Sequence, residues 1–522
     1  MKKYLLTAGA LLLWSGTALA GGAETVTMPA EAYKAIMEKL DALQKRVDVL
    51  EEGDKAAPAP APAAAVSRAE YDKLSKDIGN IYDTLDEVET KTLRDRINWG
   101  AELRTRVDNY KLSELSGVDY KLAKTPAGGL KAVFPDSDGE HDDNNWTNRV
   151  RLNMDAKIND TLSFHGRMAV YKNWGDSDIT TMAGFNDMNR AHRPGTSGVN
   201  LDRAYVDWVP DFIVPVAVTV GRHPSSEGPP LEYKENRQRQ STYPGLLFDT
   251  ENDGIVVTFG LERYTGLKNA GWRFAYGKGY HSDDDDSSSF SFFDDENEAS
   301  DTNMYATFLE SEIPGLDNSL VVLSYAHMTE LPSSFLGNDE PVSLGDMDLY
   351  GVHAQASKLL GSNFDLFVSW AGNHSDANGQ VQVFPQVSGL GGLGYPDPVD
   401  VTMGLLSADG TENRTGSSIF AGLRYTVPFT PLHDPKIGFE YNHGSKYWMS
   451  MTLASTEMFN KLATRGDAYE FYYIQPVNDN LFFRAGYTFI DYAYTGSGSH
   501  LGQPAETDAE LDNYYLLMDV RF

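Results

Sequence analysis

The chain of 522 residues contains no cysteine. This absence excludes disulfide bonds, thiol catalysis, cysteine-bound iron–sulfur clusters and thioether-linked haem. Common enzyme motifs are missing as well, because there is no His-Glu-x-x-His, no Walker-type phosphate loop and no Gly-x-Ser-x-Gly elbow. The few histidines never stand at zinc spacing. We therefore expect neither an enzyme nor a bound cofactor.

Long hydrophobic runs are missing after the first twenty residues. Residues 1–20 have the form of a secretory signal, with Lys2 and Lys3, an apolar stretch at 4–14 and the small-x-small sequence Ala-Leu-Ala at 18–20. No later stretch holds about 18 consecutive apolar residues, so we expect no transmembrane helix. Transmembrane β-strands remain open, because they need only about 9–11 residues, half of them apolar.

Positive charge is scarce, with 44 Lys and Arg against 75 Asp and Glu and a net charge of −31. This balance argues against nucleic acid as a partner. Acidic stretches at 136–143, 283–286 and 294–296 are candidate Ca²⁺ or Mg²⁺ sites, because these ions prefer oxygen ligands. Such ions would bridge external loops to outer-membrane lipid and lipopolysaccharide. The alternative is an acidic surface that is merely solvated.

Residues 21–96 carry two heptad seams separated by a Pro/Ala-rich linker at 54–66. The spacing of three and four residues predicts a coiled-coil arm in the periplasm that self-associates, with a homotrimer as the expected state. The alternatives are two amphipathic helices packed on a barrel rim, or a spacer that reaches the cell wall. The seam residues are Tyr33, Ile36, Leu40, Leu43, Val47 and Leu50, then Tyr71, Leu74, Ile78, Ile81, Leu85 and Val88.

From residue 97 the hydrophobic period changes to two. On the last strand, Tyr514, Leu516, Met518, Val520 and Phe522 alternate with a second, more polar face. This alternation is typical of a transmembrane strand with one face toward lipid and one toward a polar lumen. The ending, with Tyr514 and Phe522, also resembles the assembly signal of Gram-negative outer-membrane barrels.

About sixteen such segments lie between residues 97 and 522, and long polar connections alternate strictly with short turns. Bacterial barrels have an even number of strands, long external loops and short periplasmic turns. The predicted fold is a 16-stranded antiparallel transmembrane β-barrel, integral to the cell outer membrane and preceded by the coiled-coil arm.

This architecture resembles the sixteen-stranded Gram-negative porins. The segment LDRAYVDWVP…VAVTVGRHP at 201–224 is similar to phosphate-selective-type porins. The segments IGFEYNHGSKYW at 437–448 and IQPVNDNLFFRAGYTFIDYAYTGSG at 474–498 are similar to an uncharacterised porin-like family of anaerobic, often metal-reducing bacteria. The resemblance implies that the third external loop, residues 222–251, folds into the pore and narrows it.

Arginines concentrate on the expected lumen faces and in the third loop. Arg-rich walls favour anions in pores, so we expect a passive channel for small hydrophilic solutes with a preference for anions. The alternative is that these arginines only pair with Glu102, Asp108, Asp155 and Asp207 on neighbouring strands. The candidate selectivity residues are Arg104, Arg106, Arg149, Arg151, Arg167, Arg203, Arg222, Lys234, Arg237, Arg239, Glu232 and Glu235.

Two other functions stay open at this point. One is a barrel that sheathes an exported multihaem cytochrome, which the second family resemblance suggests. The other is a structural protein that tethers the outer membrane to the cell wall through residues 21–96.

Overall fold

The computed structural model describes residues 97–125, 129–134, 139–174, 198–280, 300–333, 341–452 and 457–522. The chain forms two compact units, Met1–Asp95 and Arg96–Phe522, and all described residues belong to the second. The expected signal sequence, heptad seams and linker, and the acidic stretches 136–138, 283–286 and 294–296, lie outside the described residues.

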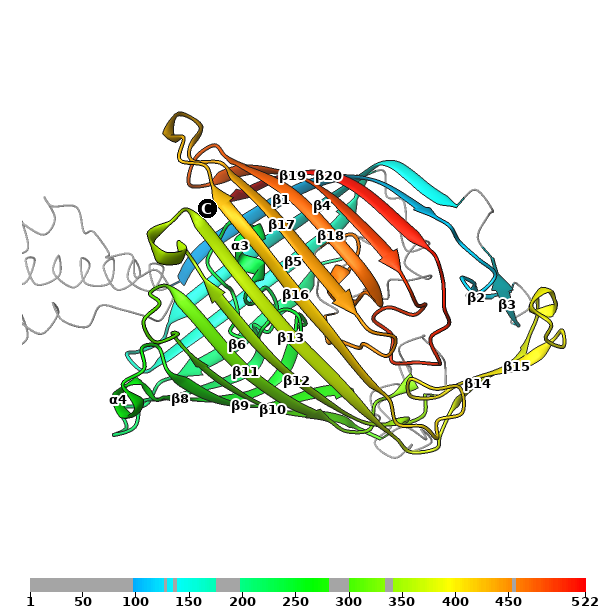
Figure 1. Ribbon diagram of the computed structural model, residues 1–522. Helices are drawn as coiled ribbons and strands as arrows, with labels where there is room; N and C mark the ends of the chain where they lie inside the picture. The colour runs from blue at the N-terminus through cyan, green and yellow to red at the C-terminus, as the bar shows by residue number, and fades with distance from the viewer. Residues whose placement is uncertain are drawn as a thin grey trace, which may run out of the picture. The chain divides into compact units, whose positions relative to one another are not determined.

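Sixteen strands close into one antiparallel barrel, which confirms the predicted fold (Figure 1). Each strand pairs with the next barrel strand in the chain, and the last pairs with the first. The strands are β1 (Ile97–Ser113), β4 (Glu140–Lys157), β5 (Leu162–Asn173), β6 (Asn200–Trp208), β7 (Val216–His223), β8 (Asn252–Gly260), β9 (Gly271–Tyr280), β10 (Thr302–Ser311), β11 (Ser319–Met328), β12 (Gly345–Ala356), β13 (Phe364–Ala377), β16 (Thr415–Thr426), β17 (Lys436–Gly444), β18 (Gly466–Pro476), β19 (Leu481–Tyr492) and β20 (Glu510–Arg521).

Smaller elements lie in the connections. Two hairpins, which the sequence did not predict, belong to long loops and project from the barrel (Figure 1). None of the helices in the described ranges is long and apolar enough to cross a membrane. These elements are β2 (Lys121–Lys124), β3 (Leu130–Val133), β14 (Gln382–Val387), β15 (Val399–Met403), α3 (Leu231–Glu235), α4 (Glu262–Thr265), η5 (Leu359–Gly361), η6 (Gly391–Leu393), η7 (Thr430–Leu432) and η8 (Lys461–Ala463).

Long and short connections alternate around the barrel, as the sequence predicted. We call the end with the turns 158–161, 209–215, 261–270, 312–318, 357–363, 427–435 and 477–480 the short-turn end. The opposite end, which carries the third loop, is the long-loop end. We also name four of its other connections: loop 5 (329–344), loop 6 (378–414), loop 7 (445–465) and loop 8 (493–509).

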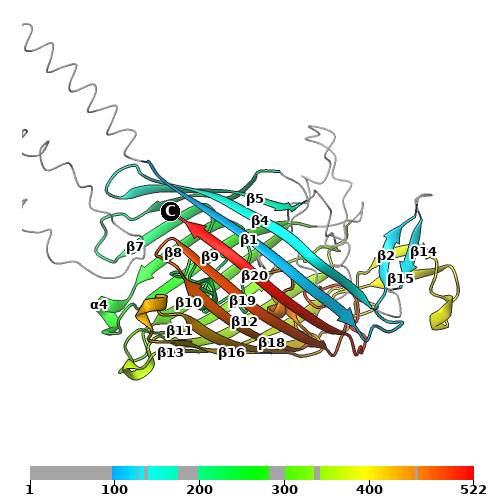
Figure 2. The ribbon, with the colours of Figure 1, turned by 90° about the horizontal axis from the view of Figure 1, so that it is seen from above.

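The barrel closes where β20 pairs with β1, and Figure 2 shows β1 between β4 and β20. The N–H of Ala101 donates to the carbonyl of Phe522 and the N–H of Phe522 to the carbonyl of Ala101, both at 3.0 Å. Tyr514 and Phe522 are exposed on the outer face, whereas Tyr515 and Leu517 are buried on the inner face. The face assignment of the last strand is therefore confirmed, and the role of its end in assembly stays a prediction.

The inner face differs from the expected water-lined wall, because several neighbouring strands carry apolar side chains on it. Side chains from β10, β11, β12, β13 and β16 form one buried cluster with residues of the third loop. On β10, for example, Met304 and Phe308 are buried while Tyr305 and Leu309 on the opposite face are exposed. Apolar side chains therefore occupy both faces of these strands, a pattern that occurs when the interior is packed rather than filled with water.

Glycines make room for aromatic rings on the inner wall. Gly438 lies directly opposite Tyr472 on the neighbouring strand, and Gly486 lies opposite Tyr515. A Cβ atom at residue 438 would lie 2.0 Å from the Tyr472 ring, and one at residue 486 would lie 2.4 Å from the Tyr515 ring. The missing side chains let both rings lie against the wall beneath the third loop.

We expect Gly438→Val to destabilise the barrel by about 3 kcal/mol, because the new side chain would displace the buried Tyr472 ring. The measurement is the urea midpoint of unfolding in detergent, followed by tryptophan fluorescence. Gly392→Val is the matched control, because a Cβ atom there meets nothing within 4 Å. Equal midpoints for both variants would contradict this account of the glycine.

Candidate functional site: the third loop inside the barrel

The third loop folds into the barrel and carries α3 across its interior (Figure 1). Its side chains reach strands on opposite sides of the wall. Glu235 accepts hydrogen bonds from Arg104 on β1 at 3.2 Å and from Arg484 on β19 at 3.1 Å. Glu232 accepts one from Gln355 on β12 at 2.7 Å. The loop is thus fixed to both halves of the barrel.

The helix α3 is short because its ends are set by special residues. Pro230 precedes it and offers no N–H, which suits the start of a helix. Asn236 ends it in the left-handed conformation, with φ of 49°, and its N–H points back to the carbonyls of Glu232 and Tyr233. The chain therefore turns sharply after one helical turn.

Charged side chains of α3 are buried and paired. Lys234 donates to Glu470 on β18 at 3.0 Å and lies 3.2 Å from Glu457 in loop 7. The carbonyl of Lys234 accepts a hydrogen bond from Arg484. Removing one partner of a buried ion pair costs about 3–5 kcal/mol, so these contacts hold α3 in place.

Glu227, near the start of the loop, binds three arginines. Its carboxylate lies 2.6 Å from Arg151, 3.5 Å from Arg149 and 3.7 Å from Arg237. Burial by itself raises the pKa of Glu227, but the three guanidinium groups outweigh it and hold the pKa well below its usual value. This carboxylate is therefore the main electrostatic contact between the loop and β4.

All six wall arginines predicted from the sequence lie on the inner face and are at most 7% exposed. Each lies within 4 Å of a carboxylate, so the expected unpaired positive lumen is not observed in this conformation. The partners are Asp519 and Glu235 for Arg104, Asp108 and Glu457 for Arg106, Glu102 and Glu227 for Arg149, Glu102, Asp202 and Glu227 for Arg151, Asp202 and Glu251 for Arg167, and Glu251 for Arg203.

The sequence alternative, pairing between neighbouring strands, holds for only one of its four carboxylates. Glu102 on β1 pairs with Arg149 on β4, whereas Asp108 pairs with Arg106 on its own strand. Asp155 instead lies 2.5 Å from His165, and Asp207 lies 3.6 Å from the same ring. Two of the remaining partners, Asp202 on β6 and Asp519 on β20, come from strands that neighbour those of Arg167 and Arg104. The others come from the third loop and loop 7, which are remote in sequence.

One predicted pore residue is wrongly placed. Arg222 lies on the same face of β7 as the exposed Val220, and it pairs with Asp253 at 2.9 Å. Alternation along β7 explains this, because Val216, Val218, Val220 and Arg222 share the outer face. The other loop residues predicted for the pore, Glu232, Lys234, Glu235, Arg237 and Arg239, all point to inner-wall partners.

The sequence reasoning missed several inner residues. Lys461 in loop 7 pairs with both Glu440 and Glu470, and Arg484 is completely buried. Strand alternation places Arg484 and Asp519 on inner faces, so that signal was available. No local signal pointed to Lys461, because it reaches the wall from a long loop.

Apolar residues of several long loops pack with the inner wall in one buried cluster. Leu246, Leu247 and Phe248 of the third loop pack in one cluster with residues of loops 5, 6, 7 and 8. The N–H of Met451 in loop 7 donates a hydrogen bond to the backbone carbonyl of Leu247 at 3.0 Å. The residues that loops 5 to 8 contribute are at most 7% exposed. They are Leu331, Leu344, Leu405, Leu406, Trp448, Met449, Leu462 and Leu501.

Asp249 gives the third loop a dependence on pH. Burial raises the pKa of its carboxyl to about 7, while the hydrogen bond that it accepts from the N–H of Glu227 at 2.8 Å opposes the rise. Between about pH 4, the usual Asp value, and pH 7, the folded state keeps a proton that the unfolded chain has lost. The free energy of unfolding therefore falls as pH rises through this window and then levels off.

We expect Asp249→Asn to remove this slope. The free energy of unfolding of the variant minus that of the native protein should rise by about 2–3 kcal/mol from pH 5 to pH 8. Urea midpoints measured at both pH values provide the test. A difference between the two proteins that does not change with pH would contradict the buried, protonated Asp249.

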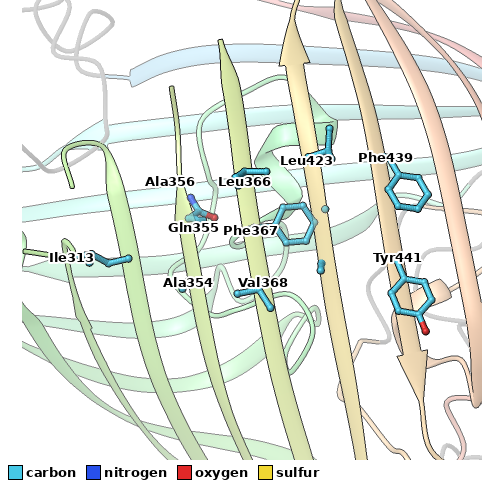
Figure 3. Close-up of a pocket in the computed structure, with 12 residues that line it drawn as sticks. Ile313, Ala354, Gln355, Ala356, Leu366, Phe367, Val368, Leu423, Phe439 and Tyr441 are labelled. Carbon is cyan, nitrogen blue, oxygen red and sulfur yellow. The ribbon is translucent and has the colours of Figure 1, made fainter. Parts of the chain in front are cut away.

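A separate hollow of about 650 Å³ lies in the wall at β12, β13, β16 and β17 (Figure 3). It is lined by exposed apolar residues of the outer face, among them Leu366, Val368 and Leu423. The hollow is thus distinct from the lumen, and the ion-paired residues do not line it.

Metal binding finds no support among the residues that the structure describes, where no group of three His, Asp or Glu side chains is placed to hold an ion. The acidic stretches outside these ranges remain a prediction.

A closed barrel of sixteen strands, with an apolar outer face, alternating long loops and short turns, and a third loop folded inward, is the fold of a porin-type β-barrel. The chain belongs to the family described as "Protein of unknown function (DUF3373)", whose model matches residues 139–520. Among curated proteins, none matches this sequence.

Three solved structures contain chains that are similar to this one. OprB of Pseudomonas putida is 12% identical, with a TM-score of 0.44 over 83% of this chain and 96% of that one. OmpF of Salmonella typhi, in complex with daunomycin, is 10% identical, with a TM-score of 0.41 over 81% and 97%. OmpT of Vibrio cholerae, in trimer form, is 10% identical, with a TM-score of 0.38 over 82% and 99%.

Proposed function

We propose that this protein is a porin-type outer-membrane channel for small hydrophilic solutes, and that its third loop closes the lumen in this conformation. The observation that supports the proposal is α3, which lies inside the barrel and is ion-paired to β1, β18 and β19. Sixteen strands are enough to enclose an aqueous channel once the loop moves away. In the proposed channel the short turns face the periplasm and the long loops face the outside of the cell.

The open channel is proposed to prefer anions. The first four barrel strands carry six inner arginines, whereas the carboxylates that these strands supply to them are Glu102, Asp108 and Asp202. The third loop adds Glu227, Glu235 and Glu251. When the loop leaves, the wall keeps a surplus of positive charge, which favours anions in a narrow pore.

Planar-bilayer recording of the purified native protein tests the proposal. We expect a channel that is closed most of the time and opens briefly. Its reversal potential in a KCl gradient should have the sign that indicates preferential passage of chloride. A steadily open, cation-selective pore would contradict both parts.

The cytochrome sheath is less favoured, because the third loop and loop 7 occupy the interior that a second protein would need. A trimer formed through residues 21–96 and a tether to the cell wall remain predictions, since both depend on residues outside the described ranges.

A further inference from the structure

Six cations lie on the inner face and the third loop near the short-turn end. We call them the mouth cations. Arg273, Arg424 and Lys436 stand within three residues of a short turn, and Arg521 ends the last strand. Arg239 pairs with Glu310, which lies beside the turn 312–318. The mouth cations are Arg237, Arg239, Arg273, Arg424, Lys436 and Arg521.

Water reaches this end of the lumen. The inner-face side chains of Lys157 and Asp155, near the end of β4, are 68% and 57% exposed. Deeper residues on the same face, such as Arg151, are buried. Side chains of the inner face are therefore accessible to solvent near the short-turn end, and we call this end of the lumen the vestibule.

The vestibule presents cations and hides their carboxylates. The side chains of Arg239, Arg424 and Arg521 are 30%, 13% and 19% exposed. Their partners Glu310, Asp365 and Asp519 are 6%, 5% and 1% exposed. A solute that reaches these pairs therefore meets the guanidinium groups before their partner carboxylates, while Asp155 is the exposed carboxylate at the same end.

One of the mouth cations has no carboxylate partner, and another has a donor without a partner that is buried in this conformation. Lys436 donates to the side-chain oxygen of Asn236, and no described carboxylate lies within ion-pair distance of it. Arg273 uses its Nη2 for Glu310 at 2.8 Å, while its buried Nη1 has no hydrogen-bond partner among the described residues. Arg239 shares Glu310 at 3.4 Å, a long contact.

We propose that the mouth cations form a binding site for a small anion with at least two phosphate or carboxylate groups, entering from the short-turn side. Several guanidinium groups and one amine match such a ligand, because charge-assisted hydrogen bonds to these oxygens are stronger than neutral ones. The site goes beyond the proposed channel, since binding in the vestibule does not require the third loop to move.

Calorimetric titration of pyrophosphate into the full-length protein in detergent, at constant ionic strength, tests the site. We expect saturable binding that Arg239→Gln with Lys436→Gln weakens by about tenfold or more. The matched control, Arg263→Gln with Lys268→Gln, removes the same charge from the exposed turn 261–270 and should keep the native affinity. A parallel titration with citrate separates phosphate from carboxylate ligands.

No saturable binding of either anion to the native protein would overturn the proposal, and so would an equal loss in both double variants. If the first pair prevents folding, Arg239→Gln alone serves in its place, because this side chain is 30% exposed. Because the assay needs no conductance, its failure leaves the proposed channel untouched, and a silent bilayer leaves the site untouched.

Discussion

Replacing residues 226–247 with a short Gly-Ser linker is expected to raise single-channel conductance by about tenfold or more, because the wall of sixteen strands then encloses an open aqueous lumen. The replacement removes three carboxylates, Glu227, Glu232 and Glu235, and three cations, Lys234, Arg237 and Arg239. The net charge of the lumen is therefore unchanged, and the reversal potential in a KCl gradient should keep the sign of the native channel. Planar-bilayer recording measures both quantities.

The matched control replaces residues 382–402, which carry the β14–β15 hairpin. That segment is of similar length and packs against β2 and β3, away from the third loop. It should leave conductance at the native level. Equal conductance for the native protein and the variant without the third-loop segment would mean that this loop does not close the barrel.

Glu227→Gln should loosen the third loop without shortening it. The substitution keeps the shape of the side chain but leaves Arg149, Arg151 and Arg237 around a neutral amide. We expect the free energy of unfolding to fall by about 3 kcal/mol and channel openings to become more frequent. Urea unfolding and bilayer recording measure the two effects.

Glu262→Gln is the control for this variant, because Glu262 lies on the exposed α4, where its carboxylate bonds only locally, to the N–H of Asn269. Stability and opening frequency should match the native protein. If Glu227→Gln were as stable and as rarely open as this control, the arginines would not hold the loop through Glu227.

Strand positions and most strand faces were predictable from sequence, since a period of two is a local signal. Leu103 and Arg104 fall on opposite faces as the alternation predicts, and the same rule, applied strictly to β7, would have placed Arg222 outside. Loop lengths identified the third loop. The inward turn of this loop followed from resemblance to porins rather than from its own residues.

The partners of the buried charges could not be predicted, because they depend on closure of the barrel. Lys234 and Glu470 are 236 positions apart, and Arg104 and Asp519 are 415 apart. The apolar part of the inner wall could not be predicted either. Because β10 and β11 carry apolar residues on both faces, alternation does not show which face points inward. The β2–β3 and β14–β15 hairpins are short strands inside long polar loops.

An engineered disulfide tests most directly whether the third loop is seated inside the barrel. Phe248 and Met451 are bridge partners of the third loop and loop 7, so their Cα atoms lie about 5 Å apart, within disulfide reach. The chain has no cysteine of its own. We predict that Phe248→Cys with Met451→Cys cross-links on oxidation and suppresses the brief openings until it is reduced. Two thiols that stay unlinked and react freely with a membrane-impermeant maleimide would show that the loop lies elsewhere.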